Sequence, residues 1–226
     1  MSVSAFYRST IGKKIIMGIT GLIGIGFVIL HVAGNLQAFE GQSKLNGYSA
    51  MLHGPLNELL WVLRVVLVVA VVLHVTMAYQ LTRRSAVARP IGYQRREAQV
   101  STLAARTMKW GGVLLLVFIV FHILHFTTET FDPGHAAGMV DPHGDHDVYG
   151  NIVASFHVWW VAAFYLLAMV ALGLHLFHGA WSSLRTLGYA KPSDHPLHRR
   201  IALVLAAAIW LGFSLLPVGV IAGVIH

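Results

Sequence analysis

Residues 56–81 read LNELLWVLRVVLVVAVVLHVTMAYQL, an apolar run that carries His74 within it. At 1.5 Å per residue, a helix of this length is long enough to cross roughly 30 Å of hydrocarbon. Four further stretches have the same character: 15–36, 108–128, 152–182 and 201–224. The stretch 152–182 is longer than a span requires, so we expect it to tilt or to extend beyond the bilayer. The sequence therefore predicts a single-domain, all-α integral membrane bundle of five transmembrane helices.

Composition supports a membrane protein. Of the 226 residues, 56% are hydrophobic and 11% are charged, whereas a soluble domain carries about 25% charged residues. The absence of cysteine excludes disulfides, thiolate zinc sites and an iron–sulfur cluster held by this chain's own ligands. Lys13 and Lys14 precede the first apolar run as in a signal peptide, but the run is too long and contains His31 and Asn35. We therefore interpret it as a retained helix.

Charge predicts the orientation of the bundle. The net charge of +7 comes from 16 basic and 9 acidic residues. Fourteen basic residues form three groups on one side of the predicted membrane: Arg8, Lys13, Lys14; Arg83, Arg84, Arg89, Arg95, Arg96, Arg106, Lys109; and Arg185, Lys191, Arg199, Arg200. Seven acids lie toward the other side: Glu40, Glu58, Glu129, Asp132, Asp141, Asp145 and Asp147. The positive-inside rule makes the basic side, with the N-terminus, cytoplasmic in a bacterial-type cytoplasmic membrane. The basic residues thus indicate topology and argue against a nucleic-acid partner.

Four of the 14 histidines lie inside four different predicted spans. His74 and His175 each stand ten residues before an arginine at the cytoplasmic side, which places both roughly 15 Å from that side. His31 and His122 stand 17 and 13 residues after a lysine at the same side, hence roughly 20–25 Å from it. The histidines therefore form two layers, an outer one of His31 with His122 and an inner one of His74 with His175.

Paired imidazoles from facing helices suit low-spin haem iron with two axial nitrogens. Gly24 lies two turns from His31, and Gly111 lies eleven residues before His122, so both leave room for a porphyrin edge. One buried histidine is more often a helix–helix hydrogen bond than a ligand, but four matched in depth favour haem. A histidine-lined, haem-free transporter is the alternative. It would more typically keep an acidic residue near the midplane, and the spans carry none there.

Other histidines have less specific signals. His125 and His178 each follow a candidate ligand by three residues. We interpret His178 as a residue beside the ligand or at the level of the haem propionates, and His125 as facing propionates or a quinone. The loop 131–149 holds His135, His143 and His146 among four Asp. Its Gly and Pro favour a solvated outer loop over a metal site.

Four motifs follow one another along these spans: LHVAGN at 30–35, His74 followed by Ala78 and Tyr79, FH at 121–122, and HLFHGAWS at 175–182 with LG at 187–188. In this order, over nearly the whole chain, they resemble the di-haem cytochrome b membrane anchor of succinate dehydrogenase and fumarate reductase, the succinate:quinone oxidoreductase family. The motif at 175–182 is the most specific. Gly173 stands where some di-haem relatives carry a proton-conducting Glu, so we do not expect that proton route.

The resemblance implies two haem b groups, the inner one on His74 and His175 and the outer one on His31 and His122. It implies a flavoprotein and an iron–sulfur subunit on the cytoplasmic side, and a quinone, expected to be menaquinone, in the membrane lipid. The chain would then serve the respiratory chain and the tricarboxylic acid cycle as the membrane subunit of an enzyme that can assemble into a higher oligomer. Alternatives are the anchor of a fumarate reductase, hydrogenase or formate dehydrogenase.

A quinone site next to the outer haem needs a proton-exchanging group. Glu129 stands seven residues beyond His122, hence on the same face and roughly 10 Å further out. Arg64 and Glu58, which precede His74, are further candidates, although interfacial snorkelling or capping would explain them equally. At the inner side, Arg185, Lys13 and Ser9 are candidate partners of haem propionates. The Arg-rich inner loops would dock the soluble subunits or simply orient the chain.

Overall fold

The computed structural model describes residues 2–88, 102–190 and 195–226. Five helical segments are long and apolar enough to cross a membrane, which confirms the predicted all-α bundle. They are α2 Thr10–Asn35 continued by the 3₁₀ turn η1 Leu36–Glu40, α4 Asn57–Val87, α5 Leu103–His122 continued by the π-helical turn η2 Ile123–Thr127, α7 Trp159–Thr186, and α8 His195–Ile221. Within the described ranges no strand forms beyond one isolated bridge, Val140 to His146.

Three short helices join the spans: α1 Val3–Arg8, α3 Gln42–His53 and α6 Val148–His157. The predicted helix 152–182 is corrected here, because the extended backbone of Val158 separates α6 from α7. Ser9 separates α1 from α2 in a similar way, and its hydroxyl accepts a hydrogen bond from the N–H of Gly12 at 2.8 Å. A Ser at this position satisfies a backbone donor that would otherwise be unpaired at the helix start.

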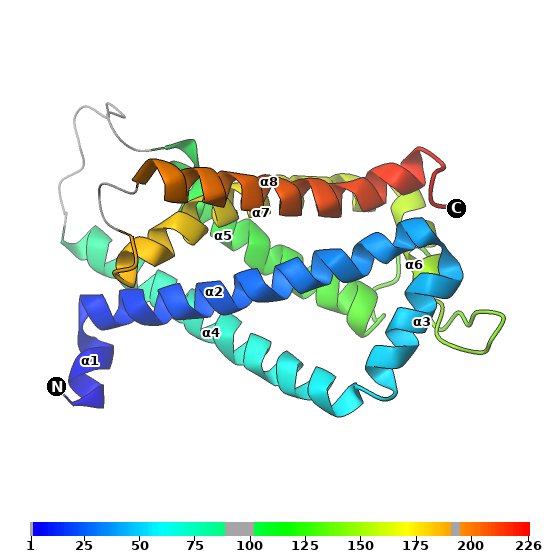
Figure 1. Ribbon diagram of the computed structural model, residues 1–226, viewed down its shortest axis with the longest axis horizontal. Coiled ribbons are helices and arrows are strands. Elements are labelled where there is room, and N and C mark those ends of the chain that lie inside the picture. The colour runs from blue at the N-terminus through cyan, green and yellow to red at the C-terminus, as the bar shows by residue number, and fades with distance from the viewer. Residues whose placement is uncertain (1, 89–101, 191–194) are drawn as a thin grey trace.

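Helix α7 is the centre of the bundle and contacts α2, α5 and α8. Its buried face contains small side chains, including Ala162, Ala168 and Ala180, which allow helices to approach closely. Helix α4 packs mainly against α2 and diverges from the other spans toward its N-terminal end (Figure 1). Only Ala70 and Met77 of α4 are buried, so its remaining apolar surface is available to lipid.

Basic and acidic residues gather at opposite ends of the bundle. At the basic end lie α1, the C-termini of α4 and α7, and the N-termini of α5 and α8. At the acidic end lie η1, α3, α6 and the loop 128–147, which hold most of the acidic residues. Arg89, Arg95, Arg96 and Lys191 of the predicted basic groups lie outside the described residues.

Asn46 of α3 holds the acidic end together. Its amide donates to Asp141 at 3.2 Å and to Asp147 at 2.9 Å, and its carbonyl oxygen accepts from the N–H of Tyr149 at 3.0 Å. Burial alone would raise the pKa of Asp147, but hydrogen bonds from Asn46, Gly150 N–H and Gln42 outweigh it and lower that pKa. Helix α3, the loop and the start of α6 are therefore tied into one cap over this end of the spans.

Candidate functional site: two histidine pairs

The structure brings His31 of α2 against His122 of α5, with ring centroids 5.8 Å apart. We call this the outer pair because it lies nearer the acidic end. Aromatic side chains surround it: Phe27 stacks on His31, Phe118 stacks on His122, and Phe213 of α8 lies 5.5 Å from His31, centroid to centroid. The outer pair therefore lies in an apolar, aromatic environment between three helices.

The inner pair, nearer the basic end, consists of His74 from α4 and His175 from α7, with ring centroids 6.0 Å apart. Helix α7 relates the two layers, because Tyr165 contacts His122 of the outer pair and stands ten residues before His175. Ten residues correspond to about 15 Å along a helix. The two pairs therefore lie at two different levels of the bundle.

The spacing within each pair fits one metal ion held between two imidazoles. A metal–nitrogen bond of about 2.0 Å places each ring centroid about 3 Å from the metal, so two rings on opposite sides are about 6 Å apart. The observed separations of 5.8 and 6.0 Å agree with that value. Within the described ranges, no group of three or more His, Asp or Glu side chains could hold a metal ion by itself. Haem needs only two protein ligands, because the porphyrin supplies the others.

Hydrogen bonding determines which nitrogen of His74 is free to bind. Its Nδ1 lies 3.1 Å from the carbonyl oxygen of Met17 and 3.3 Å from the hydroxyl of Thr20. A carbonyl oxygen can only accept, so Nδ1 carries the proton and Nε2 carries the lone pair. Gly21 allows this approach, since a Cβ there would lie 3.3 Å from Cε1 of His74. Helix α2 therefore orients a candidate ligand that belongs to α4.

The other two candidate ligands differ from His74 in which ring nitrogen is occupied. The amide nitrogen of Asn35 lies 3.4 Å from Nε2 of His31, which makes that Nε2 the acceptor. Nδ1 of His175 and Nδ1 of His178 are buried without a hydrogen-bond partner. Buried polar atoms without a partner are uncommon in folded proteins and call for an explanation such as a bound group. The inner site is therefore the one that leaves buried ring nitrogens without a hydrogen-bond partner.

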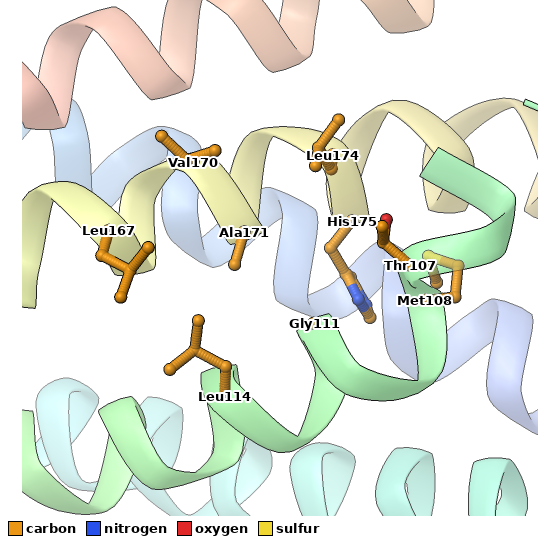
Figure 2. A pocket seen from close by; sticks show the side chains of 9 residues that line it. All are labelled: Thr107, Met108, Gly111, Leu114, Leu167, Val170, Ala171, Leu174 and His175. Atoms are coloured by element: carbon orange, nitrogen blue, oxygen red, sulfur yellow. The ribbon is translucent and has the colours of Figure 1, made fainter. Parts of the chain in front are cut away.

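Space adjoins the inner pair. A Cβ added at Gly24 or Gly111 would meet no atom within 4 Å. A cavity of about 140 Å³ between α5 and α7 is lined by His175, Gly111, Thr107 and apolar side chains (Figure 2). This is less than the roughly 300–1,000 Å³ typical of sites for drug-sized ligands, so a porphyrin requires the helices to separate further.

Comparison with known proteins adds nothing to the geometry of the site. No protein-family profile, curated protein or solved structure matches the chain. What distinguishes the site is its composition: two interhelical histidine pairs, each from a different pair of helices, at two depths of one bundle.

His125 does not face a free ligand site. It is 1% exposed, with Nδ1 3.0 Å from the hydroxyl of Tyr165 and Nε2 2.9 Å from the hydroxyl of Ser155. Both ring nitrogens are thus used within the protein. The prediction that His125 faces propionates or a quinone is wrong for this arrangement, and the residue instead links η2 to α6 and α7.

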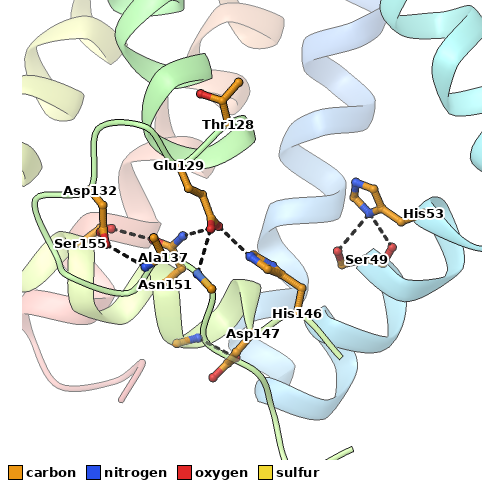
Figure 3. Close-up of polar contacts among 12 residues, drawn as sticks. Ser49, His53, Thr128, Glu129, Asp132, Ala137, His146, Asp147, Asn151 and Ser155 are labelled. Carbon is orange, nitrogen blue, oxygen red and sulfur yellow. Dashed lines mark hydrogen bonds and ion pairs between the residues drawn. The ribbon is translucent and has the colours of Figure 1, made fainter. Parts of the chain in front are cut away.

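Glu129 is not on the face of the helix that carries His122. The α-helix ends at His122, a π-helical turn follows, and Glu129 adopts a left-handed backbone with φ of 52°. Its carboxylate accepts from His146 at 2.7 Å, Asn151 at 3.0 Å and the N–H of Gly138 at 3.1 Å (Figure 3). The predicted placement of Glu129 on the same face as His122 is therefore wrong, and Glu129 belongs to the loop network.

The remaining candidates lie at the two ends. Arg64 contacts His53 of α3 at 3.2 Å and Trp61, and Glu58 is exposed in the first turn of α4. At the basic end, the guanidinium of Arg185 lies over the Trp181 ring. Three further candidates for binding propionates lie at the basic end: Lys13, Ser9 and His178. Lys13 is buried against Gln80 and Tyr7, His178 lies near Trp181, and the hydroxyl of Ser9 is occupied as a helix cap, which contradicts a propionate role for it.

Sequence reasoning missed the residues that orient the ligands. Tyr165, Thr20 and the carbonyl of Met17 contact His122 and His74, yet none is near them in the chain. The available signal was Tyr165 itself, because a buried Tyr hydroxyl in an apolar span normally requires a hydrogen-bond partner.

Proposed function

We propose that this chain is the haem-b-containing membrane anchor of a succinate:quinone oxidoreductase. His31 with His122 and His74 with His175 would each hold one haem b. Bound haem supplies one-electron redox chemistry. The bundle would carry electrons between an iron–sulfur subunit, bound with the flavoprotein at the basic end, and a membrane quinone, expected to be menaquinone.

One observation carries this proposal: two histidine pairs with centroids about 6 Å apart, stacked along one bundle. The histidines of both pairs lie among apolar side chains. Hydrogen bonds to Nδ1 of His74 and His122 orient their rings. Burial and hydrogen bonding are the means by which a protein adjusts a haem potential.

The two ends of the bundle suit different partners. The basic end presents Arg84, Arg185, Arg199 and Arg200 for an acidic surface of the iron–sulfur subunit. The chain has no cysteine, so the iron–sulfur clusters must come from that partner. At the acidic end, Glu129 lies beside Asn151 and His146 and is the proton-exchanging candidate of the quinone site, with Arg64 and Glu58 as more exposed candidates.

A reduced-minus-oxidised spectrum of the purified full chain tests the haem proposal. We expect b-type absorption bands and two haems per chain by extraction. His31→Ala and His74→Ala should each remove about half of the haem, because each destroys one pair. His157→Ala is the matched control, since His157 lies beyond the spans and bonds only the carbonyl of Val153. Absence of b-type absorption in the unmodified chain would overturn the proposal.

The substrate class is tested in the complex. We expect succinate to reduce the haem as dithionite does when the flavoprotein and iron–sulfur subunits are bound. The haem could instead be reduced by dithionite and by hydrogen or formate, but not by succinate. That result would identify the anchor of another quinone-linked dehydrogenase.

A further inference from the structure

A continuous chain of hydrogen bonds joins the acidic-end loop to the outer pair. The hydroxyl of Tyr165 lies 3.1 Å from Nδ1 of His122 and 3.0 Å from Nδ1 of His125. Nε2 of His125 lies 2.9 Å from Oγ of Ser155. Three polar groups from η2, α6 and α7 are thus in contact beside His122.

The chain of hydrogen bonds continues to the loop 128–147. The Ser155 hydroxyl donates to Oδ1 of Asn151 at 3.0 Å, and Nδ2 of Asn151 donates to the Glu129 carboxylate at 3.0 Å. His146, half exposed, meets the same carboxylate oxygen at 2.7 Å (Figure 3). The four intermediate side chains are nearly inaccessible, from 0% exposure for Ser155 to 6% for Tyr165. Water therefore has little access to these hydrogen bonds.

The donors and acceptors in this chain of hydrogen bonds can be assigned in one consistent direction. A carboxylate only accepts, so Asn151 presents its NH₂ to Glu129 and its oxygen to Ser155. The single proton of Ser155 goes to Asn151, hence Nε2–H of His125 must donate to Ser155. With no carboxylate in contact, a charged His125 is costly at this depth, so its ring is neutral and Nδ1 accepts from the hydroxyl of Tyr165.

The last step reaches the outer pair. The hydroxyl of Tyr165 has given its only proton to His125, so it can only accept from His122. Nδ1 of His122 therefore carries the proton, and Nε2 carries the lone pair. We propose that Tyr165, His125, Ser155 and Asn151 are positioning residues that hold His122 in the one neutral form whose Nε2 can bind a metal.

For the haem, this proposal rests on the proposed function; for the tautomer of His122, it rests on the hydrogen bonds alone. Donation from Nδ1–H increases the basicity of a metal-bound imidazole. A more basic ligand stabilises the oxidised iron, so this chain of hydrogen bonds keeps the reduction potential of the outer haem low. A loop carboxylate thereby acts on a ligand that it does not touch.

Potentiometric titration of the two haems in the full chain tests this. Ser155→Ala is the decisive variant, because Ser155 contacts His125 and Asn151 but not His122. Tyr165→Phe removes the acceptor of His122 directly with little change of shape. We expect both to raise the ratio of reduced to oxidised outer haem at fixed potential about tenfold, which equals about 59 mV for one electron. The inner haem should not shift.

Ser183→Ala is the matched control, since Ser183 is a buried serine of α7 that bonds the carbonyl of Ala180 and lies eight residues beyond His175. It should leave the outer potential unchanged. An outer potential that Ser155→Ala and Tyr165→Phe leave in place would overturn the proposal, as would equal shifts of both haems.

A second readout does not need haem. In the ¹⁵N-histidine-labelled chain without haem, with the His122 signals assigned by their absence in His122→Gln, we expect the proton on Nδ1. In Ser155→Ala this preference should be lost. A proton on Nε2 of His122 in the unmodified chain would overturn the inference. A chain that binds no haem but keeps Nδ1–H would instead overturn only the proposed function.

Discussion

Nδ1 of His74 lies 3.1 Å from the backbone carbonyl oxygen of Met17, one helix away. The inner pair is therefore oriented by a main-chain atom that no substitution removes. His122 of the outer pair depends instead on the Tyr165 side chain. The two sites reach the same ligand form by different means, and they should respond differently to substitution.

The close approach of α2 and α4 predicts the effect of Gly21→Val. A side chain at Gly21 would displace His74, whose Cε1 lies 3.3 Å from the position of a Cβ there. We expect loss of the inner haem, about half of the total absorption, while the outer haem stays. Gly26→Val is the control, because a Cβ at Gly26 meets nothing within 4 Å. Full haem content in Gly21→Val would contradict the assignment of His74.

Glu129→Gln tests the quinone site at the acidic end. Glutamine keeps an oxygen for Asn151 but cannot exchange protons as a carboxylate does, so quinone turnover of the complex should fall about a hundredfold or more. Haem content should stay the same. Asp145→Asn, a change on the exposed loop, should turn over normally. Unchanged turnover in Glu129→Gln with intact haem would exclude Glu129 as the proton donor.

The absence of cysteine makes orientation measurable. Tyr189 at the basic end is 76% exposed, and Val140 at the acidic end is 65% exposed. If the basic end is cytoplasmic, a membrane-impermeant maleimide added to intact cells should label Val140→Cys and should label Tyr189→Cys only after lysis. The reverse pattern would invert the predicted topology.

Asn46 should matter for stability rather than for redox chemistry. Asn46→Ala leaves the carboxylates of Asp141 and Asp147 and the N–H of Tyr149 each with one partner fewer, so we expect a loss of roughly 1–3 kcal/mol in unfolding free energy. Thermal unfolding in detergent measures it. Asn57→Ala, at an exposed site, should have little effect. A melting temperature equal to that of the unmodified chain would show that the cap contributes nothing.

The same cap predicts the acid sensitivity of the bundle. Hydrogen bonds lower the pKa of Asp141 and Asp147 in the folded chain despite the opposing effect of burial. A lowered folded pKa means that their stabilisation is complete above the unfolded value of about 3.9 and is lost as pH falls through the folded pKa. Melting temperature should therefore drop steeply below about pH 4. The drop should be smaller in Asn46→Ala, because this hydrogen-bond donor is missing there.

Sequence reasoning was strongest where the physics is local. The length of an apolar run and a rise of 1.5 Å per residue are enough to predict five spans and to place histidines in two layers. It failed where a helix ends or bends: at Val158, which divides a predicted helix, and at Glu129, which lies beyond a π-helical turn. Such breaks depend on loop contacts that periodicity does not contain.

The amino-acid order thus specified the membrane bundle and the order of its histidine layers, which follow from hydrophobic length and helical rise. It also specified the polarity of the two ends, which follows from the positions of the charged residues. Tertiary contacts alone revealed which ring nitrogen is free. Met17 and His74 are 57 residues apart in the chain, and His122 and Tyr165 are 43 apart. The direction of a hydrogen bond between such segments is set by packing, and it is this direction that makes two of the histidines suitable ligands.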